Sequence, residues 1–190
     1  RMDTQCGPIR IEVVEPLVSI RLIVEDHEGI SADLLFTGRS APIQEPRFTR
    51  RNGARLFMDL TRFTVNCRVT GWVEVDGKRE TYTDGYGTRD RSWGVRSIGA
   101  ADPQPVVPPV LPQFYWLWAP TNFPNLSLYA HVNEDQEGAP WNRRASLMMD
   151  GGGQGDAIHL HDDKFVMDWT PGQRHATSAA LAVKDAQGRD

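Results

Sequence analysis

Short runs of β-prone residues, separated by turn residues, constrain the fold of this chain more than any other feature. Residues 9–14, 17–24 and 32–36 are rich in Ile, Val and Leu, and residues 25–29 separate the last two runs. The 17 glycines and 13 prolines are spread along the 190 residues and leave little room for long helices. This spacing predicts an all-β sandwich or barrel.

The same pattern continues along the chain. Asp76-Gly77 is a strong signal for a two-residue hairpin because type I′ turns need positive φ angles, and it joins runs 71–75 and 79–82. Further candidate strands are 114–118, 126–132, 145–149, 157–161, 164–169 and 176–184.

Residues 54–70 contain neither glycine nor proline and fit two patterns. The first is the apolar spacing of a helix. The second is a long bent strand with four side chains on one face: Phe63, Val65, Cys67 and Val69. The β-branched and aromatic residues from Phe63 onward favour the strand, which is our prediction.

Composition excludes several classes of protein. Lys and Arg number 21 against 25 for Asp and Glu, so the net charge of −4 argues against non-specific binding to nucleic acid. No run approaches the roughly 20 apolar residues of a membrane helix. Two cysteines, Cys6 and Cys67, are too few for a disulfide framework or a cysteine-based zinc site.

A proline-rich stretch at 98–112 predicts an extended connector between two β units, 1–97 and 113–190. The chain begins at Arg1 without a methionine, and residues 186–188 resemble a hairpin turn whose second strand is missing. We therefore expect both units to be incomplete at the outer ends of the chain. Unpaired edges would then require a second copy or further chain to cover them.

The densest cluster of polar and aromatic residues spans 82–96. On a strand, Arg89, Arg91 and Trp93 share one face, and Asp90 lies on the other. In a structural interpretation Asp90 pairs with an arginine at the end of a barrel and Trp93 plugs the core. In a functional interpretation burial of Asp90 in a cavity raises its pKa and makes it a proton donor. The residues alone favour the structural interpretation.

Three stretches resemble one known family. The run Arg-Asp-Arg-Ser-Trp-Gly-Val-Arg at 89–96 is fairly specific, and residues 53–75 and 114–120 support it. Together they resemble the bacterial carotenoid 1,2-hydratase (hydroxyneurosporene synthase) and AttH-like family, which is related to lipocalins. The resemblance implies two consecutive lipocalin-like antiparallel β-barrels. It also implies a cytoplasmic bacterial location, with peripheral membrane association as a further option.

Characterised relatives in that wider group hydrate or cyclise hydrophobic substrates, and the requirements of such chemistry select candidate residues. Hydration of an alkene begins with protonation by a neutral carboxylic acid, for which Asp90 and Asp59 are the candidates. Aromatic rings stabilise the resulting cation in a dry pocket. The candidate rings are Tyr86, Trp93, Trp116 and Trp118. The candidates for orienting the carboxylates or binding a polar end of the ligand are Arg62, Arg89 and Arg91.

Other chemistry is less well supported by the sequence. His159 and His161 have a spacing that suits a metal, but such a pair is more typical of an exposed strand end. We predict no cofactor and no metal. The leading hypothesis is binding, with acid-catalysed hydration, isomerisation or cyclisation, of an isoprenoid or lipid-like molecule. The alternatives are a non-catalytic carrier of such a ligand and a structural module with a solid core. A cavity of roughly 300 Å³ or more favours binding.

Overall fold

The computed structural model describes residues 3–52, 54–95 and 115–188. Within these ranges the chain forms thirteen strands and no helix, so the all-β prediction is confirmed. The chain divides into two compact units: residues 1–104 with 149–156, and residues 105–148 with 157–190. We call these the first and the second unit. The predicted connector, 98–112, lies outside the described residues.

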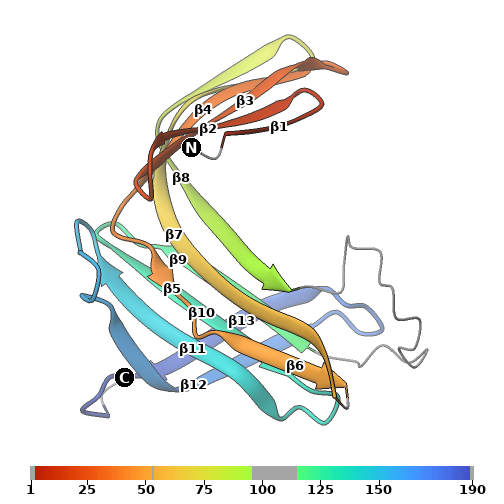
Figure 1. The fold of residues 1–190 in the computed structure, drawn as a ribbon, viewed down its shortest axis with the longest axis vertical. Helices are drawn as coiled ribbons and strands as arrows, with labels where there is room; N and C mark the ends of the chain where they lie inside the picture. Colours follow the sequence, from red (N-terminus) through yellow and green to blue (C-terminus); the bar gives the residue numbers. More distant parts are fainter. Residues whose placement is uncertain (1–2, 53, 96–114, 189–190) are drawn as a thin grey trace. The chain divides into compact units, whose positions relative to one another are not determined.

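The first unit is one eight-stranded antiparallel sheet with the order β1-β2-β3-β4-β7-β5, in which β6 and β8 also pair with β7. Figure 1 shows β7 and β8 as two long neighbouring strands that run the length of this unit. The strands are β1 (Thr4–Cys6), β2 (Ile9–Glu15), β3 (Ser19–His27), β4 (Ile30–Gly38), β5 (Ile43–Gln44), β6 (Phe48–Asn52), β7 (Arg55–Val75) and β8 (Lys78–Val95).

Residues 55–70 of the ambiguous stretch 54–70 form a strand, as predicted, and make up most of β7. Its pairing with β8 defines two faces of the sheet. The Phe63 face carries Phe63, Val65, Cys67 and Val69 of β7 with Arg89, Arg91 and Trp93 of β8. The Asn66 face carries Arg62, Thr64 and Asn66 of β7 with Thr88, Asp90 and Ser92 of β8.

Apolar side chains continue across the Phe63 face into the neighbouring strands. Val69 pairs with Phe36 of β4, and Phe36 pairs with Ile20 of β3. Phe36 also packs against the buried cluster formed by Phe63, Val65 and Cys67. Every second residue of these strands points to this face. The register therefore adds further apolar side chains to it, namely Leu22 and Val24 of β3 and Leu34 of β4.

A β-bulge in β8 sets which of its side chains share the Phe63 face. The predicted hairpin forms at Asp76-Gly77, where both φ angles are positive (49° and 75°). From this turn the pairing runs regularly to Gly71 opposite Tyr82, but the next pair joins Val69 to Gly85. One extra residue of β8 therefore lies between these pairs, and it moves every later β8 side chain to the other face.

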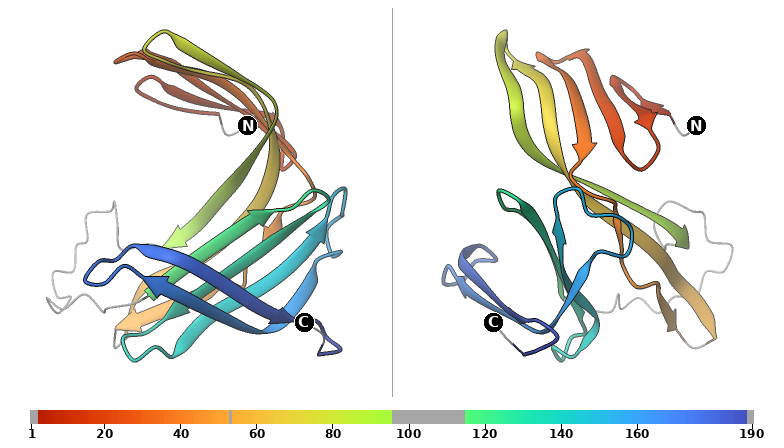
Figure 2. Two further views of the ribbon diagram at one scale, coloured as in Figure 1. Left: turned by 180° about the vertical axis from the view of Figure 1, so that it is seen from behind. Right: turned by 90° about the vertical axis from the view of Figure 1, so that its left-hand side faces the viewer.

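The second unit is a five-stranded antiparallel sheet with the order β13-β12-β11-β10-β9 (Figure 2). A core cluster of Ala130, Ala145 and Leu160 packs beneath partly buried Leu, Phe and Val side chains. Residues 157–161 and 164–169, predicted as two strands, belong to one strand with an irregularity between His161 and Lys164. The strands are β9 (Tyr115–Asn122), β10 (Leu126–Glu134), β11 (Pro140–Met149), β12 (Ile158–Trp169) and β13 (Ala176–Lys184).

Candidate functional site

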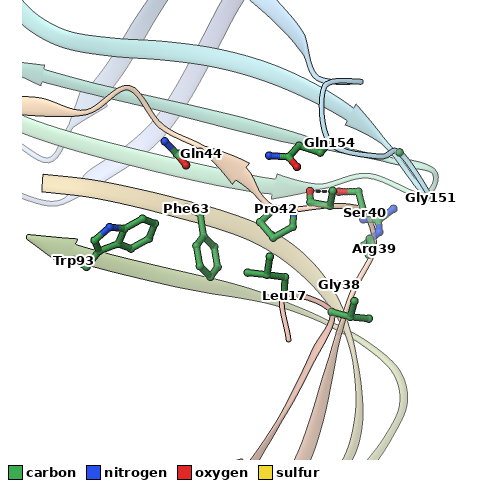
Figure 3. A pocket seen from close by; sticks show the side chains of 13 residues that line it. Leu17, Gly38, Arg39, Ser40, Pro42, Gln44, Phe63, Trp93, Gly151 and Gln154 are labelled. Atoms are coloured by element: carbon green, nitrogen blue, oxygen red, sulfur yellow. Dashed lines mark hydrogen bonds between the residues drawn. The ribbon is translucent and has the colours of Figure 1, made fainter. Parts of the chain in front are cut away.

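A pocket of about 560 Å³ opens on the first unit, and Figure 3 shows the side chains around it. Phe63 of β7 and Trp93 of β8 form one wall, with ring centroids 6.1 Å apart and a tilt of 59°. Trp93 is about half exposed (48 %), whereas Phe63 is buried (7 %). The pocket therefore offers an accessible indole beside a fixed phenyl ring.

A second wall is the segment from Gly38 to Pro42, which backbone hydrogen bonds hold on two sides. The Arg39 amide donates to the Asn66 carbonyl (2.9 Å), and the Arg39 carbonyl accepts from the Gly151 amide (2.7 Å). The Arg39 side chain is almost fully buried and forms an ion pair with Asp150 at 2.8 Å. These contacts fix the turn at 150–152, which is part of the first unit, against the pocket.

Leu17, at the edge of the pocket, has a strained backbone conformation. It lies in the turn between β2 and β3 with a φ of 64°, and its side chain is 55 % exposed. A bulky non-glycine residue rarely adopts a positive φ, and such strain concentrates at functional sites. Exposure of a leucine here adds apolar surface at the mouth of the pocket.

The chemistry of the lining suits an apolar ligand with a few polar contacts. Besides the aromatic wall, Leu17, Val18 and Pro42 supply apolar surface, and Gln44 and Gln154 supply amides. None of the described residues that line the pocket carries a carboxylate. Ligand pockets in general are mostly apolar with a few polar groups that orient the ligand.

Asp90, the first candidate acid, lies on the Asn66 face, opposite the side on which Phe63 and Trp93 point. Its side chain is 37 % exposed, and Oδ1 lies 3.9 Å from Nε of Arg62. Arg62 itself forms a buried ion pair with Glu45 at 2.5 Å. Asp90 and Arg62 thus belong to a charged cluster with Glu45 and do not line the pocket.

Asp59, the second candidate acid, is held by an arginine. Arg47 donates from Nε and Nη2 to the two carboxylate oxygens at 2.7 and 2.6 Å. These hydrogen bonds, together with the charge of Arg47, hold the pKa of Asp59 below its usual value. A lowered pKa keeps the group ionised, which is the opposite of what a proton donor needs.

The candidate rings and arginines are distributed over several places. Tyr86 is half exposed, and two guanidiniums lie over its ring, those of Arg68 at 4.4 Å and Arg39 at 5.3 Å from the centroid. Trp116 and Trp118 belong to β9 of the second unit. Of the candidates, the structure brings Arg89, Arg91 and Trp93 together on the Phe63 face.

The histidine pair lies on β12 in the second unit. His159 Nδ1 is 2.9 Å from the buried hydroxyl of Ser146, and burial together with the charges of Arg144 and His161 lowers the pKa of His159. Among the described residues, no group of three or more His, Cys, Asp or Glu side chains is placed to hold a metal ion.

The sequence patterns do not reveal most of the pocket wall. They place Phe63 on a strand face, but they indicate no role in binding for Phe63, for segment 38–42 or for the turn at 151–154. The signal for Phe63 was its alternation with Cys67, which marks it as facing the same side. The pocket wall at 38–42 depends on contacts with residue 66 and with residues near 151, which no local pattern reveals.

Comparison with known proteins gives a family. The chain matches, over residues 1–190, a family of unknown function, DUF8625, and so belongs to that family. No curated protein and no solved structure matches it significantly. No helix in the described part of the chain is long and apolar enough to cross a membrane.

Proposed function

We propose that the first unit binds a hydrophobic small molecule in the pocket between Phe63, Trp93 and segment 38–42, as a carrier. The pocket volume of about 560 Å³ carries this proposal, because it exceeds the roughly 300 Å³ of the smallest common ligand pockets. The apolar wall that continues across the Phe63 face supports it. An isoprenoid or lipid-like molecule has the shape and polarity that such a wall favours.

The positions of the two acids favour a carrier over a hydratase or cyclase. Acid-catalysed hydration or cyclisation needs a neutral carboxylic acid within hydrogen-bond reach of the substrate. Asp59 is an ion-paired carboxylate with a lowered pKa, and Asp90 lies on the other face of the sheet. Neither group lines the pocket.

Titration with Nile red, a neutral dye whose fluorescence rises in apolar surroundings, tests this function. The wild-type chain should bind the dye with saturation. Trp93→Ala should weaken binding about tenfold, since roughly 1.4 kcal/mol corresponds to a factor of ten and an aromatic wall supplies at least this much. Trp93 is half exposed, so its replacement should leave the fold intact.

Trp116→Ala is the matched control. Trp116 is exposed to the same extent (49 %) but belongs to the second unit. The Trp116→Ala variant should bind the dye with the affinity of the wild type. An equal loss in both variants, or no saturable binding by the wild type, would contradict the proposal and favour a structural module.

A further inference from the structure

We propose that Arg89 forms an anion subsite on the Phe63 face, so that the ligand is an amphipathic carboxylate with a long apolar body. This inference rests on the proposed binding function and specifies the ligand class.

The position of Arg89 connects it to the pocket wall. Its guanidinium carbon lies 5.3 Å from the centroid of the Phe63 ring, and that ring lines the pocket. Arg89 pairs with Val65, which is almost fully buried at 1 % exposure. A charged side chain thus lies against the most apolar part of the sheet, over the phenyl ring of Phe63.

The guanidinium has no anionic partner among the described residues. Its Nη1 is buried and makes no hydrogen bond to any of them, and none of their carboxylates forms an ion pair with Arg89. Arg89 as a whole is half-buried, and a partly desolvated charge without a counter-ion carries a cost that an ion pair with good hydrogen bonds usually offsets. The Phe63 ring supplies only the weaker cation–π attraction.

The surroundings of Arg89 increase the demand for an anion. Arg91 lies two residues further along the same face, and its charge adds to burial in lowering the pKa of Arg89. Where β7 residues 59–69 pair with β8 residues 85–95, Asp59 is the acid on this face. Its carboxylate is already held by Arg47.

A carboxylate fits this position for geometric reasons. A guanidinium presents two parallel N–H donors that match the two oxygens of a carboxylate. The donors lie beside Phe63, so a bound carboxylate would leave its chain free to follow the Phe63 and Trp93 wall. The binding energy would then combine apolar burial with one charge-assisted contact.

Displacement of Nile red by three twelve-carbon compounds tests the inference: dodecanoate, dodecan-1-ol and dodecylamine, all below their aggregation limits at pH 7.5. The wild type should bind dodecanoate at least tenfold more tightly than the alcohol, and the amine most weakly. Arg89→Gln should reduce the preference for dodecanoate over dodecanol to less than threefold while changing the alcohol affinity less than twofold.

Arg79→Gln is the control because it also removes one positive charge from β8. Arg79 forms an ion pair with Glu74 and lies far along β8 from Arg91, the residue that pairs with Phe63. It should retain the tenfold preference. If Arg89→Gln also retains it, or if the wild type binds dodecanoate and dodecanol equally, the anion subsite is wrong and the carrier function stands. If the wild type binds neither Nile red nor any of the three compounds, the carrier function itself fails.

Discussion

The two faces of the β7–β8 pair use arginine in different ways. On the Asn66 face Arg62 forms an ion pair with Glu45, and Arg68, which projects to the same side, forms one with Asp84 at 3.1 Å. On the Phe63 face Arg89 lies among apolar side chains, and no carboxylate in the described part of the chain pairs with it.

In our proposal, this difference separates charges that hold strands together from a charge that binds a ligand. A charge paired within the chain holds strands together, and its removal leaves its partner uncompensated. A charge on an apolar face without such a partner reduces stability and is retained for another reason, which we assign to ligand binding. Residues 89–95 contribute to both faces, with Asp90 on the Asn66 face and Arg89 and Arg91 on the Phe63 face.

Deletion of Thr83, which lies in the β8 bulge, should have the largest effect on the free energy of unfolding, because it exchanges the two faces of β8 beyond the bulge. Without the extra residue, Asp90 would face Phe63 and the two arginines would move to the Asn66 face. Placing Asp90 on the apolar face without a partner should cost roughly 5 kcal/mol or more of the free energy of unfolding, measured by urea denaturation. Thr83→Ala keeps the bulge and should lose little, and an equally mild effect of the deletion would show that the bulge does not set the faces.

Glu45→Gln tests the Asn66 face and should have the next largest effect. Glu45 is 6 % exposed and pairs with Arg62, so the variant leaves a buried guanidinium without its charged partner. We expect a loss of about 3–5 kcal/mol in the free energy of unfolding. The double variant Glu45→Gln with Arg62→Met should recover a large part of this loss. A double variant as unstable as Glu45→Gln alone would mean that the pair is not what stabilises this face.

The pKa of the Cys67 thiol measures how well the Phe63 face is shielded from water. Burial raises the pKa of this thiol to about 11 from the ordinary value of 9.0. The folded pKa lies above the unfolded one, so the stabilisation is present below pH 9 and is lost as the pH rises through 11. The free energy of unfolding should therefore be about 1 kcal/mol lower at pH 10 than at pH 8 because of this group. Urea unfolding of the wild type at both pH values should show this difference, and the part due to Cys67 should be absent from Cys67→Ala. The same pH dependence in the wild type and in Cys67→Ala would contradict a buried, neutral thiol.

Arg89→Leu should have the smallest effect on the free energy of unfolding. The sign of this effect should be opposite to that of replacing an arginine that is ion-paired within the chain. Removing a partly desolvated cation from an apolar face should leave the free energy of unfolding unchanged or raise it by about 1 kcal/mol. Arg62→Leu, the matched change on the Asn66 face, should lower it by about 3 kcal/mol because Glu45 remains buried. Equal losses in the two thermal or urea melts would remove the distinction between the faces.

Alternation and turn signals in the sequence predict much of this fold. The alternation of Phe63, Val65, Cys67 and Val69 predicts their shared face, and Asp76-Gly77 predicts the hairpin. Counting from that hairpin without a bulge places Asp90 opposite Phe63, because the pairing from Val75 and Lys78 would then continue unshifted. The extra residue between Tyr82 and Gly85 has no distinct sequence signature, so the side on which the acid lies depends on the three-dimensional pairing.

Native mass spectrometry of the chain purified under mild conditions tests the central claim most directly, because it detects a retained ligand without any assumption about its identity. We predict an added mass of one small molecule that is released on unfolding, identifiable as an amphipathic acid, and absent or much reduced when Trp93→Ala is prepared in the same way. A bare chain mass that remains bare after incubation with dodecanoate and with Nile red would contradict the assignment of a ligand to the Phe63 face.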